Sequence, residues 1–133
     1  MHLERAALLV SSYDEGIRFF VDALGFELLQ DEAGVDEYGK PRRWVVVAPP
    51  GGEASIVISE VKTEEDRSRL GSQLGGRVAF FLRVDDFEAQ YSRMVGAGVR
   101  FVTQPRNEPY GRVAIFEDLA GNRWDLLGPV PTG

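Results

Sequence analysis

The chain has 133 residues, of which 44% are hydrophobic, and a formal net charge of −6 at pH 7. This length fits one domain with a real hydrophobic core, and the hydrophobic content excludes a disordered chain. The negative balance argues against a nucleic-acid partner, because phosphate binding favours cationic proteins. The absence of cysteine excludes a disulfide framework and thiolate chemistry.

No apolar run approaches the roughly 18 residues of a membrane span, and the first ten residues lack the layout of a signal peptide. The sequence also shows no phosphate-binding loop, nucleophile elbow or Cys/His cluster. We therefore expect a cytoplasmic protein with neither a membrane nor a nucleic-acid partner.

The first part of the chain predicts a strand, a helix and three further strands. Ser11 or Ser12 is the expected helix cap, and Gly25 follows the helix as its end signal. Pro49 begins a proline- and glycine-rich break between two of the strands. The expected strands are residues 3–10, 26–31, 42–48 and 54–59, the helix is about 14–23, and residues 32–41 form a loop or hairpin bend.

The second part repeats this order after a linker, residues 62–76, whose charged start allows one or two helical turns. Asp85 or Asp86 is the expected cap of a second helix, which reaches about Ala97 and ends before Gly98. The expected strands are residues 78–84 and 99–103, followed by the two strands of a closing hairpin.

The repeated order of elements indicates a duplication. Residues 9–13 match residues 83–87 at the two helix starts, and residues 23–26 match residues 96–99 at the two helix ends. The sequence thus predicts two βαβββ modules, about 3–60 and 77–128, joined by a linker at 61–76. We expect both modules to form a single domain over residues 1–133.

The closing hairpin lies between Gly111 and Leu127, where Asp118, Gly121 and Asn122 provide the turn. Alternation in the last strand places Arg123, Asp125 and Leu127 on one face and Trp124 and Leu126 on the other. Aspartate is depleted in strands, so the Asp125 carboxylate is expected to need a partner.

Residues 116–126, FEDLAGNRWDL, resemble the closing hairpin of the vicinal oxygen chelate superfamily. That superfamily contains glyoxalase I, extradiol dioxygenases, fosfomycin-resistance enzymes and bleomycin-binding proteins. Here Leu119 replaces the usual proline, and Asp125 replaces the usual metal-binding glutamate. The order of elements extends the resemblance over almost the whole chain. It implies an α+β fold in which two βαβββ modules form a curled mixed sheet around a ligand-binding cleft, with helices on the outer faces.

The metal-using relatives take their ligands from the first, fifth and last strands, and sometimes from the fourth. The corresponding positions here are Arg5, Ala79, Asp125 and one of Ser55 and Ile56. A guanidinium repels cations, alanine offers no donor, and one carboxylate does not make a zinc or iron site. The resemblance therefore implies no metal cofactor, with Asp125 as the one metal candidate. His2, the only histidine, is expected to be an exposed terminal residue.

Arg5 and Asp125 are expected to form an ion pair where the metal of relatives lies. Such a pair either supports the cleft floor and presents donors to an anionic or carbonyl ligand, or is purely structural. If Ala114 lies opposite Asp125, Arg112 is a diagonal neighbour and an alternative partner.

Further cleft candidates are aromatic or border the cleft mouth in relatives. Tyr110 is either a lid that stacks on the ligand or a packed loop residue. At most half of the aromatic residues Trp44, Phe81, Phe116 and Trp124 are expected to face a ligand. The complete set of cleft candidates is Arg5, Trp44, Ala79, Phe81, Tyr110, Arg112, Phe116 and Asp125.

The expected function is metal-free binding of a small, partly aromatic or anionic molecule. Drug-sequestering resistance proteins of the superfamily work in this way, as dimers with the ligand at the interface. A homodimer is also expected because pairing covers exposed edge strands. One rival hypothesis is a divalent-metal-dependent lyase, isomerase or dioxygenase. Another is an interaction module without a small ligand.

Overall fold

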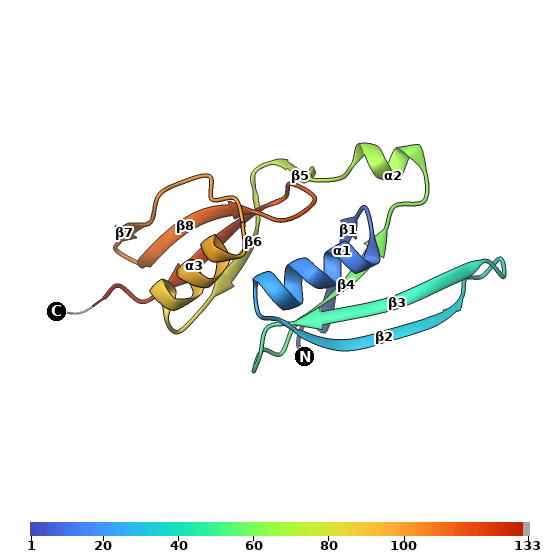
Figure 1. The fold of residues 1–133 in the computed structure, drawn as a ribbon, viewed down its shortest axis with the longest axis horizontal. Helices are drawn as coiled ribbons and strands as arrows, with labels where there is room; N and C mark the ends of the chain where they lie inside the picture. The colour runs from blue at the N-terminus through green and yellow to red at the C-terminus, as the bar shows by residue number, and fades with distance from the viewer. Residues whose placement is uncertain (132–133) are drawn as a thin grey trace. The chain divides into compact units, whose positions relative to one another are not determined.

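The computed structural model describes residues 1–131. The chain divides into two compact units, Met1–Ser68 and Arg69–Gly133, which we call unit 1 and unit 2. The division falls inside the predicted linker, and each unit contains one four-stranded sheet (Figure 1). In the described part of the chain, no helix is long and apolar enough to cross a membrane.

Unit 1 has the strand order β1-β4-β3-β2, in which β1 and β4 are parallel and the other pairs are antiparallel. Its elements are β1 (Arg5–Val10), α1 (Tyr13–Ile17), a π-helical continuation η1 (Arg18–Ala23), β2 (Glu27–Val35), β3 (Pro41–Ala48), β4 (Ser55–Glu60) and α2 (Glu64–Ser68). The α1 helix approaches the sheet closely at Gly16, because a Cβ atom there would lie 3.2 Å from Ile58 Cγ2. The core of the unit lies between this helix and the sheet.

Unit 2 has the order β6-β9-β8-β7, with β6 and β9 parallel and the other pairs antiparallel. Its elements are β5 (Gln73–Gly76), β6 (Val78–Arg83), α3 (Phe87–Gly96), β7 (Arg106–Glu108), β8 (Gly111–Glu117) and β9 (Arg123–Gly128). The two strand orders are equivalent, which confirms the duplication predicted from the sequence. The fold is α+β, with two mixed sheets.

The helix caps of the two units also correspond. Ser12 is the N-cap of α1 and its hydroxyl accepts from Glu15 N, while the Asp86 carboxylate accepts from Ala89 N at the start of α3. Gly25 and Gly98 each follow a helix with φ of 85°, a backbone conformation that favours glycine. These local signals were predicted correctly, and Ser12 and Asp86 are the caps among the alternatives.

Three predicted boundaries were wrong. Residues 99–103 do not form a regular strand. Phe101 makes an isolated bridge to Phe116, Val102 N and Thr103 N both donate to Ile115 O, and Ile115 N donates to the Thr103 hydroxyl. The strand beside β8 is instead β7, between the predicted strand at residues 99–103 and the closing hairpin. The predicted loop at residues 32–41 is partly strand, because β2 continues to Val35. The short β5 in the linker was not predicted, whereas α2 supplies the expected helical turn.

The closing hairpin of unit 2 turns around the buried Asp118, which is 5% exposed. Its Oδ1 atom accepts from Ala120 N at 2.9 Å and Asn122 N at 3.0 Å, and its Oδ2 atom accepts from Asn122 Nδ2 at 3.1 Å and Trp124 Nε1 at 3.0 Å. Burial raises the pKa of Asp118, and these N–H donors oppose that rise. The carboxylate thereby holds the turn and the core tryptophan of β9 together.

Candidate functional site

Alternation along β3 sends its basic and aromatic side chains to both faces of the unit 1 sheet. Arg43 lies on the α1 side, where its guanidinium pairs with Asp31 at 2.7 Å and with Asp14 at 2.9 Å. Arg42 and Trp44 belong to the alternate set of β3 positions. The charge of Arg43 is therefore used to hold the α1 helix to the β2–β3 hairpin, while Arg42 and Trp44 are left for another role.

Trp44 lies within cation–π distance of two guanidinium groups. The ζ carbon of Arg5 is 5.7 Å from the centre of the Trp44 ring, and that of Arg42 is 5.8 Å from it. The indole N–H donates to Gln30 Oε1 at 2.9 Å, which fixes the orientation of the ring. The Nε atom of Arg5 is buried and, among residues 1–131, has no hydrogen-bond partner. A fixed aromatic plane thus lies beside an unused cationic donor.

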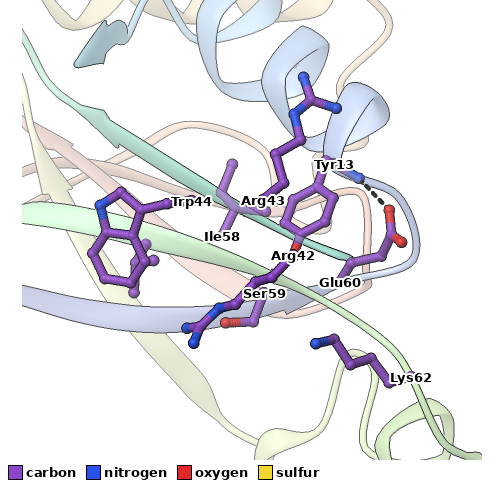
Figure 2. A pocket seen from close by; sticks show the side chains of 9 residues that line it. Tyr13, Arg42, Arg43, Trp44, Ile58, Ser59, Glu60 and Lys62 are labelled. Carbon is purple, nitrogen blue, oxygen red and sulfur yellow. Dashed lines mark hydrogen bonds between the residues drawn. The ribbon is translucent and has the colours of Figure 1, made fainter. Parts of the chain in front are cut away.

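Trp44 and Arg42 also border two cavities of unit 1. One cavity, of about 250 Å³, is lined by Glu32, Ala33, Gly34, Val35, Arg42 and Trp44. The other, of about 90 Å³, is lined by Tyr13, Arg42, Arg43, Trp44, Val57, Ile58, Ser59, Glu60 and Lys62 (Figure 2). Sequence reasoning identified Trp44 and Arg5 but missed Arg42, although its position two residues before Trp44 on one strand was a usable signal.

In unit 2, Asp125 lies between the two neighbouring strands of β9. Its register partners are Ile115 on β8 and Phe81 on β6, and the Phe81 side chain is 65% exposed. The Oδ1 atom of Asp125 is buried without a hydrogen-bond partner in the described part of the chain. Burial raises the pKa of Asp125, and the charge of Arg106 opposes the rise. Ala79 lies beside Phe81 on β6, where the register shifts between Val78 and Phe80.

The prediction that Arg112 and Phe116 line the cleft was wrong, because both lie on the other face of the sheet from Asp125. Ile115, and not Ala114, lies opposite Asp125, and a one-residue change of register reverses the face of every side chain on a strand. The Arg112 guanidinium consequently pairs with Glu88 at the start of α3 and stands over Phe87. Arg112 is therefore not the partner of Asp125.

Phe116 belongs to the same α3-facing side of the sheet. It is fully buried and contacts the rings of Phe101 and Trp124 at centroid distances of 5.7 Å each. Because the Trp124 ring is held there by Asp118, both aromatic residues belong to the core of unit 2. Of the four aromatic candidates, Trp44 and Phe81 stay candidates for ligand contact.

Two other expectations concern exposure and pairing. Tyr110 is 61% exposed just before β8, so its roles as lid and as packed loop residue both stay open. His2 is exposed, as expected of a terminal residue. The pair of Arg5 with Asp125 stays a prediction, because the two residues belong to different units.

The side chains at the ligand positions of metal-using relatives do not suit a divalent metal. Within residues 1–131, no group of three or more His, Cys, Asp and Glu side chains comes together. The Ser55 hydroxyl donates to the backbone oxygen of Glu4, and Arg5 and Ala79 have no electron pair suited to a cation. Asp125 alone does not supply the ligands that zinc or iron(II) requires. The positions equivalent to the ligands of metal-using relatives therefore do not fit a metal.

Comparison with known proteins supports the fold over nearly the whole chain. An uncharacterized protein of Shewanella frigidimarina is 45% identical over 91% of this chain and 88% of its own length. The crystal structure of TnmS3, an antibiotic binding protein from Streptomyces sp. CB03234, is 32% identical with a TM-score of 0.75, covering 97% of this chain and 96% of TnmS3. A glyoxalase/bleomycin resistance protein from the same Streptomyces strain is 31% identical with a TM-score of 0.71, covering 95% and 99% of the two chains. Residues 2–126 match the family model, and the chain belongs to the Glyoxalase/Bleomycin resistance protein/Dioxygenase superfamily.

Proposed function

We propose that this protein binds a small, partly aromatic molecule that carries an anionic or carbonyl group, and that it does so without a metal. The observation that carries this proposal is the fixed Trp44 ring with the guanidinium groups of Arg5 and Arg42 at 5.7 and 5.8 Å. In this proposal, an aromatic part of the ligand stacks at Trp44, and Arg5 Nε donates to its oxygen.

The buried Arg5 Nε gives the proposal its energetic basis. A buried donor without a partner costs about 1–3 kcal/mol, and a ligand oxygen would remove that cost. A hydrogen bond between an ionised donor and a carboxylate is also stronger than one between neutral groups. Arginine with an aromatic ring hence favours a planar anion over an uncharged ring of the same shape.

The likeness to TnmS3 supports binding over catalysis. TnmS3 is an antibiotic binding protein, and it is 32% identical to this chain over nearly the full length of both. The metal-free part of the proposal is supported by the chemistry of Arg5 and Ala79, which offer no electron pair to a cation, and of Asp125, which is a single carboxylate. Elemental analysis of the untagged protein tests it, and one tightly bound zinc, nickel, manganese or iron per chain would contradict it.

We also propose that the protein is a homodimer. The β1 and β2 strands are the edges of the unit 1 sheet, and exposed edges favour pairing with another chain. The β2 strand is exposed along its length and carries Leu28 and Leu29, which are 42% and 51% exposed. Light scattering should give the mass of two chains, and a monomer at high concentration would contradict the proposal.

Ligand binding is tested by isothermal titration with 2-naphthoate and with uncharged 2-naphthamide as probes. We expect 2-naphthoate to bind more tightly, and Arg5→Gln to weaken its binding about tenfold, which corresponds to 1.4 kcal/mol. Trp44→Leu should weaken both probes, because both lose the stacking surface. The matched control is Arg77→Gln, which changes an exposed arginine outside unit 1. Equal affinity of the parent, Arg5→Gln and Trp44→Leu proteins would contradict the proposal.

A further inference from the structure

The smaller cavity of unit 1 lies where two neighbouring strands separate. β3 and β4 pair at Val47, Val46 and Val45, and the pairing ends with Val45 opposite Ile58. Beyond that point Trp44 continues along β3 and Ser59 continues along β4 without a register partner between them, and both line the cavity. We call this cavity the β3–β4 notch. Its volume of about 90 Å³ is far below that of drug-sized ligand sites, which hold about 300–1,000 Å³.

Three cations border the β3–β4 notch, and their charges are used differently. Arg43 is neutralised by its ion pairs with Asp14 and Asp31. Arg42 and Lys62 have no carboxylate within ion-pair distance among the described residues, and only the backbone N–H of Lys62 bonds to an acid, Asp66 Oδ2 at 3.0 Å. Two side-chain cations at the notch are thus available to an anion.

The acidic groups near the notch are already engaged. Glu60 is the one carboxylate that lines it, and Glu60 Oε2 accepts the backbone N–H of Tyr13 at 2.9 Å (Figure 2). Asp36, in the β2–β3 turn, accepts the N–H groups of Tyr38 and Lys40 through Oδ1. The backbone bond from Lys40 is the largest cause that lowers the pKa of Asp36, and the charges of Lys62 and Arg42 also lower it. The positive field of these two residues therefore extends beyond their own side chains.

Neutral donors complete the lining of the notch. The Tyr13 and Ser59 hydroxyl groups are carried by α1 and β4, and Figure 2 shows the hydroxyl end of Tyr13 pointing toward the side of Ser59 and Arg42. The Tyr13 ring is held by the Arg43 guanidinium, 5.6 Å from its centre. Hydroxyl and cationic donors around a space too small for an aromatic ligand match the hydrogen-bonding needs of a compact oxyanion.

We propose that the β3–β4 notch is a binding site for a small oxyanion, such as inorganic phosphate or the phosphate group of a larger molecule. Arg42 and Lys62 neutralise its charge, while Tyr13 and Ser59 donate hydrogen bonds. The site goes beyond the proposed function, because Lys62, Tyr13 and Ser59 do not line the larger cavity at Trp44. It is independent of whether an aromatic ligand binds there.

The experiment follows the backbone amides of the ¹⁵N-labelled protein by NMR during titration with inorganic phosphate. Sodium chloride of equal ionic strength serves as the blank, since screening alone changes exposed charges. We expect saturable shifts at Tyr13, Ser59 and Glu60. Lys62→Gln should weaken phosphate binding about tenfold, whereas Lys40→Gln, which changes the only other lysine, should stay within about twofold of the parent.

The same spectra show that each variant is folded, so a loss of binding can be read directly. Shifts that do not saturate, or equal affinity in the Lys62→Gln and Lys40→Gln proteins, would overturn the oxyanion site. Phenyl phosphate in a second titration distinguishes the source of the oxyanion. Tighter binding than inorganic phosphate, lost in Trp44→Leu, would show that the oxyanion belongs to an aromatic ligand, and equal binding would assign a free ion.

A failure of the proposed function is distinguishable from a failure of this site. Loss of 2-naphthoate binding with phosphate binding intact would reject the Trp44 site and keep the β3–β4 notch. Phosphate binding that is absent while 2-naphthoate binds would do the reverse. Arg42 lines both cavities, so its replacement is uninformative between the two, and Lys62 is the residue that separates them.

Discussion

In unit 1 several cationic side chains at the sheet lack a polar partner among the described residues, whereas the closing hairpin of unit 2 satisfies its polar groups within the protein. Arg5 Nε has no hydrogen-bond partner within the described residues, and Arg42 and Lys62 have no ion-pair partner there. In unit 2, by contrast, Asp118 accepts four N–H donors, and Arg112 pairs with Glu88. The two units share one strand order, so the difference arises from side chains and not from topology.

This comparison contrasts polar groups that are satisfied inside the protein with donors that lack a partner. The aspartate of the β8–β9 turn in unit 2 is buried, whereas Asp36 in the β2–β3 turn of unit 1 is only partly buried. Groups that are satisfied inside the protein stabilise it, and donors without partners cost free energy until a ligand accepts from them. We therefore expect substitutions to affect mainly stability at the unit 2 turn and mainly ligand binding at the unit 1 face.

The largest expected effect is at Asp118. Replacement by Ala should lower the free energy of unfolding by about 3–5 kcal/mol, because buried N–H donors of Asn122 and Trp124 lose their acceptor. Asp118→Asn should cost less, since one acceptor oxygen remains. Asp36→Ala, the removal of the aspartate from the β2–β3 turn of unit 1, should cost much less than Asp118→Ala because Asp36 is only partly buried. Denaturant unfolding measures all three, and equal losses at Asp36 and Asp118 would remove the contrast between the two turns.

The second largest expected effect is the loss of stability when a methyl group is added where a helix packs closely on its sheet. In unit 2, a Cβ atom at Gly128 would lie 2.8 Å from Phe87 Cβ, so Gly128→Ala should destabilise by about 1–3 kcal/mol through overpacking. In unit 1, a Cβ atom at Gly16 would lie 3.2 Å from Ile58 Cγ2, which is a milder overlap.

At Gly16, alanine is also the better helix residue, by about 0.5–1 kcal/mol, and this gain offsets the crowding. Gly16→Ala should therefore stay within about 1 kcal/mol of the parent. Thermal unfolding of the two variants makes the measurement. A larger loss at Gly16 than at Gly128 would show that unit 1, and not unit 2, has the tighter packing of helix on sheet.

The smallest effect is the response to acid, which should have opposite signs in the two units. The hydrogen bond from Arg43 lowers the pKa of Asp31, so this residue stabilises the folded state above its unfolded pKa, and that stability is lost as the pH falls through its folded pKa. Burial raises the pKa of Asp125, so its contribution is fully present below the unfolded pKa and is lost as the pH rises through the folded pKa.

Carboxyl ¹³C NMR of the whole protein, between about pH 2 and pH 7, measures the titration midpoints of the Asp31 and Asp125 carboxyl groups. Asp125 should titrate at a higher pH than Asp31, and Arg43→Gln should move the Asp31 midpoint upward without moving that of Asp125. A common midpoint for the two carboxyl groups would show that the different surroundings of Asp31 and Asp125 do not matter.

The elements with local signals were predicted well from the sequence. Ser12 and Asp86 begin helices because an oxygen side chain accepts the free N–H groups of the first turn, and Gly25 and Gly98 end them because glycine accepts a positive φ. Alternation in β9 correctly separated Trp124 from Asp125. The failed strand at residues 99–103 shows the limit, since its contacts with β8 are irregular: Val102 N and Thr103 N both donate to Ile115 O, and Ile115 N donates to the Thr103 hydroxyl.

The face and the neighbours of each site residue depended on tertiary structure. The sequence indicated that Trp44, Arg5, Arg112 and Phe116 were candidates, but a register with Ile115 opposite Asp125 turned Arg112 and Phe116 toward α3. The β3–β4 notch likewise required the end of pairing at Val45 and the arrival of Lys62 from beyond β4. Helix caps and turns are decided by residues a few positions apart, whereas register and cavities depend on strands that are distant in sequence, and no local pattern specifies where those strands begin and stop pairing.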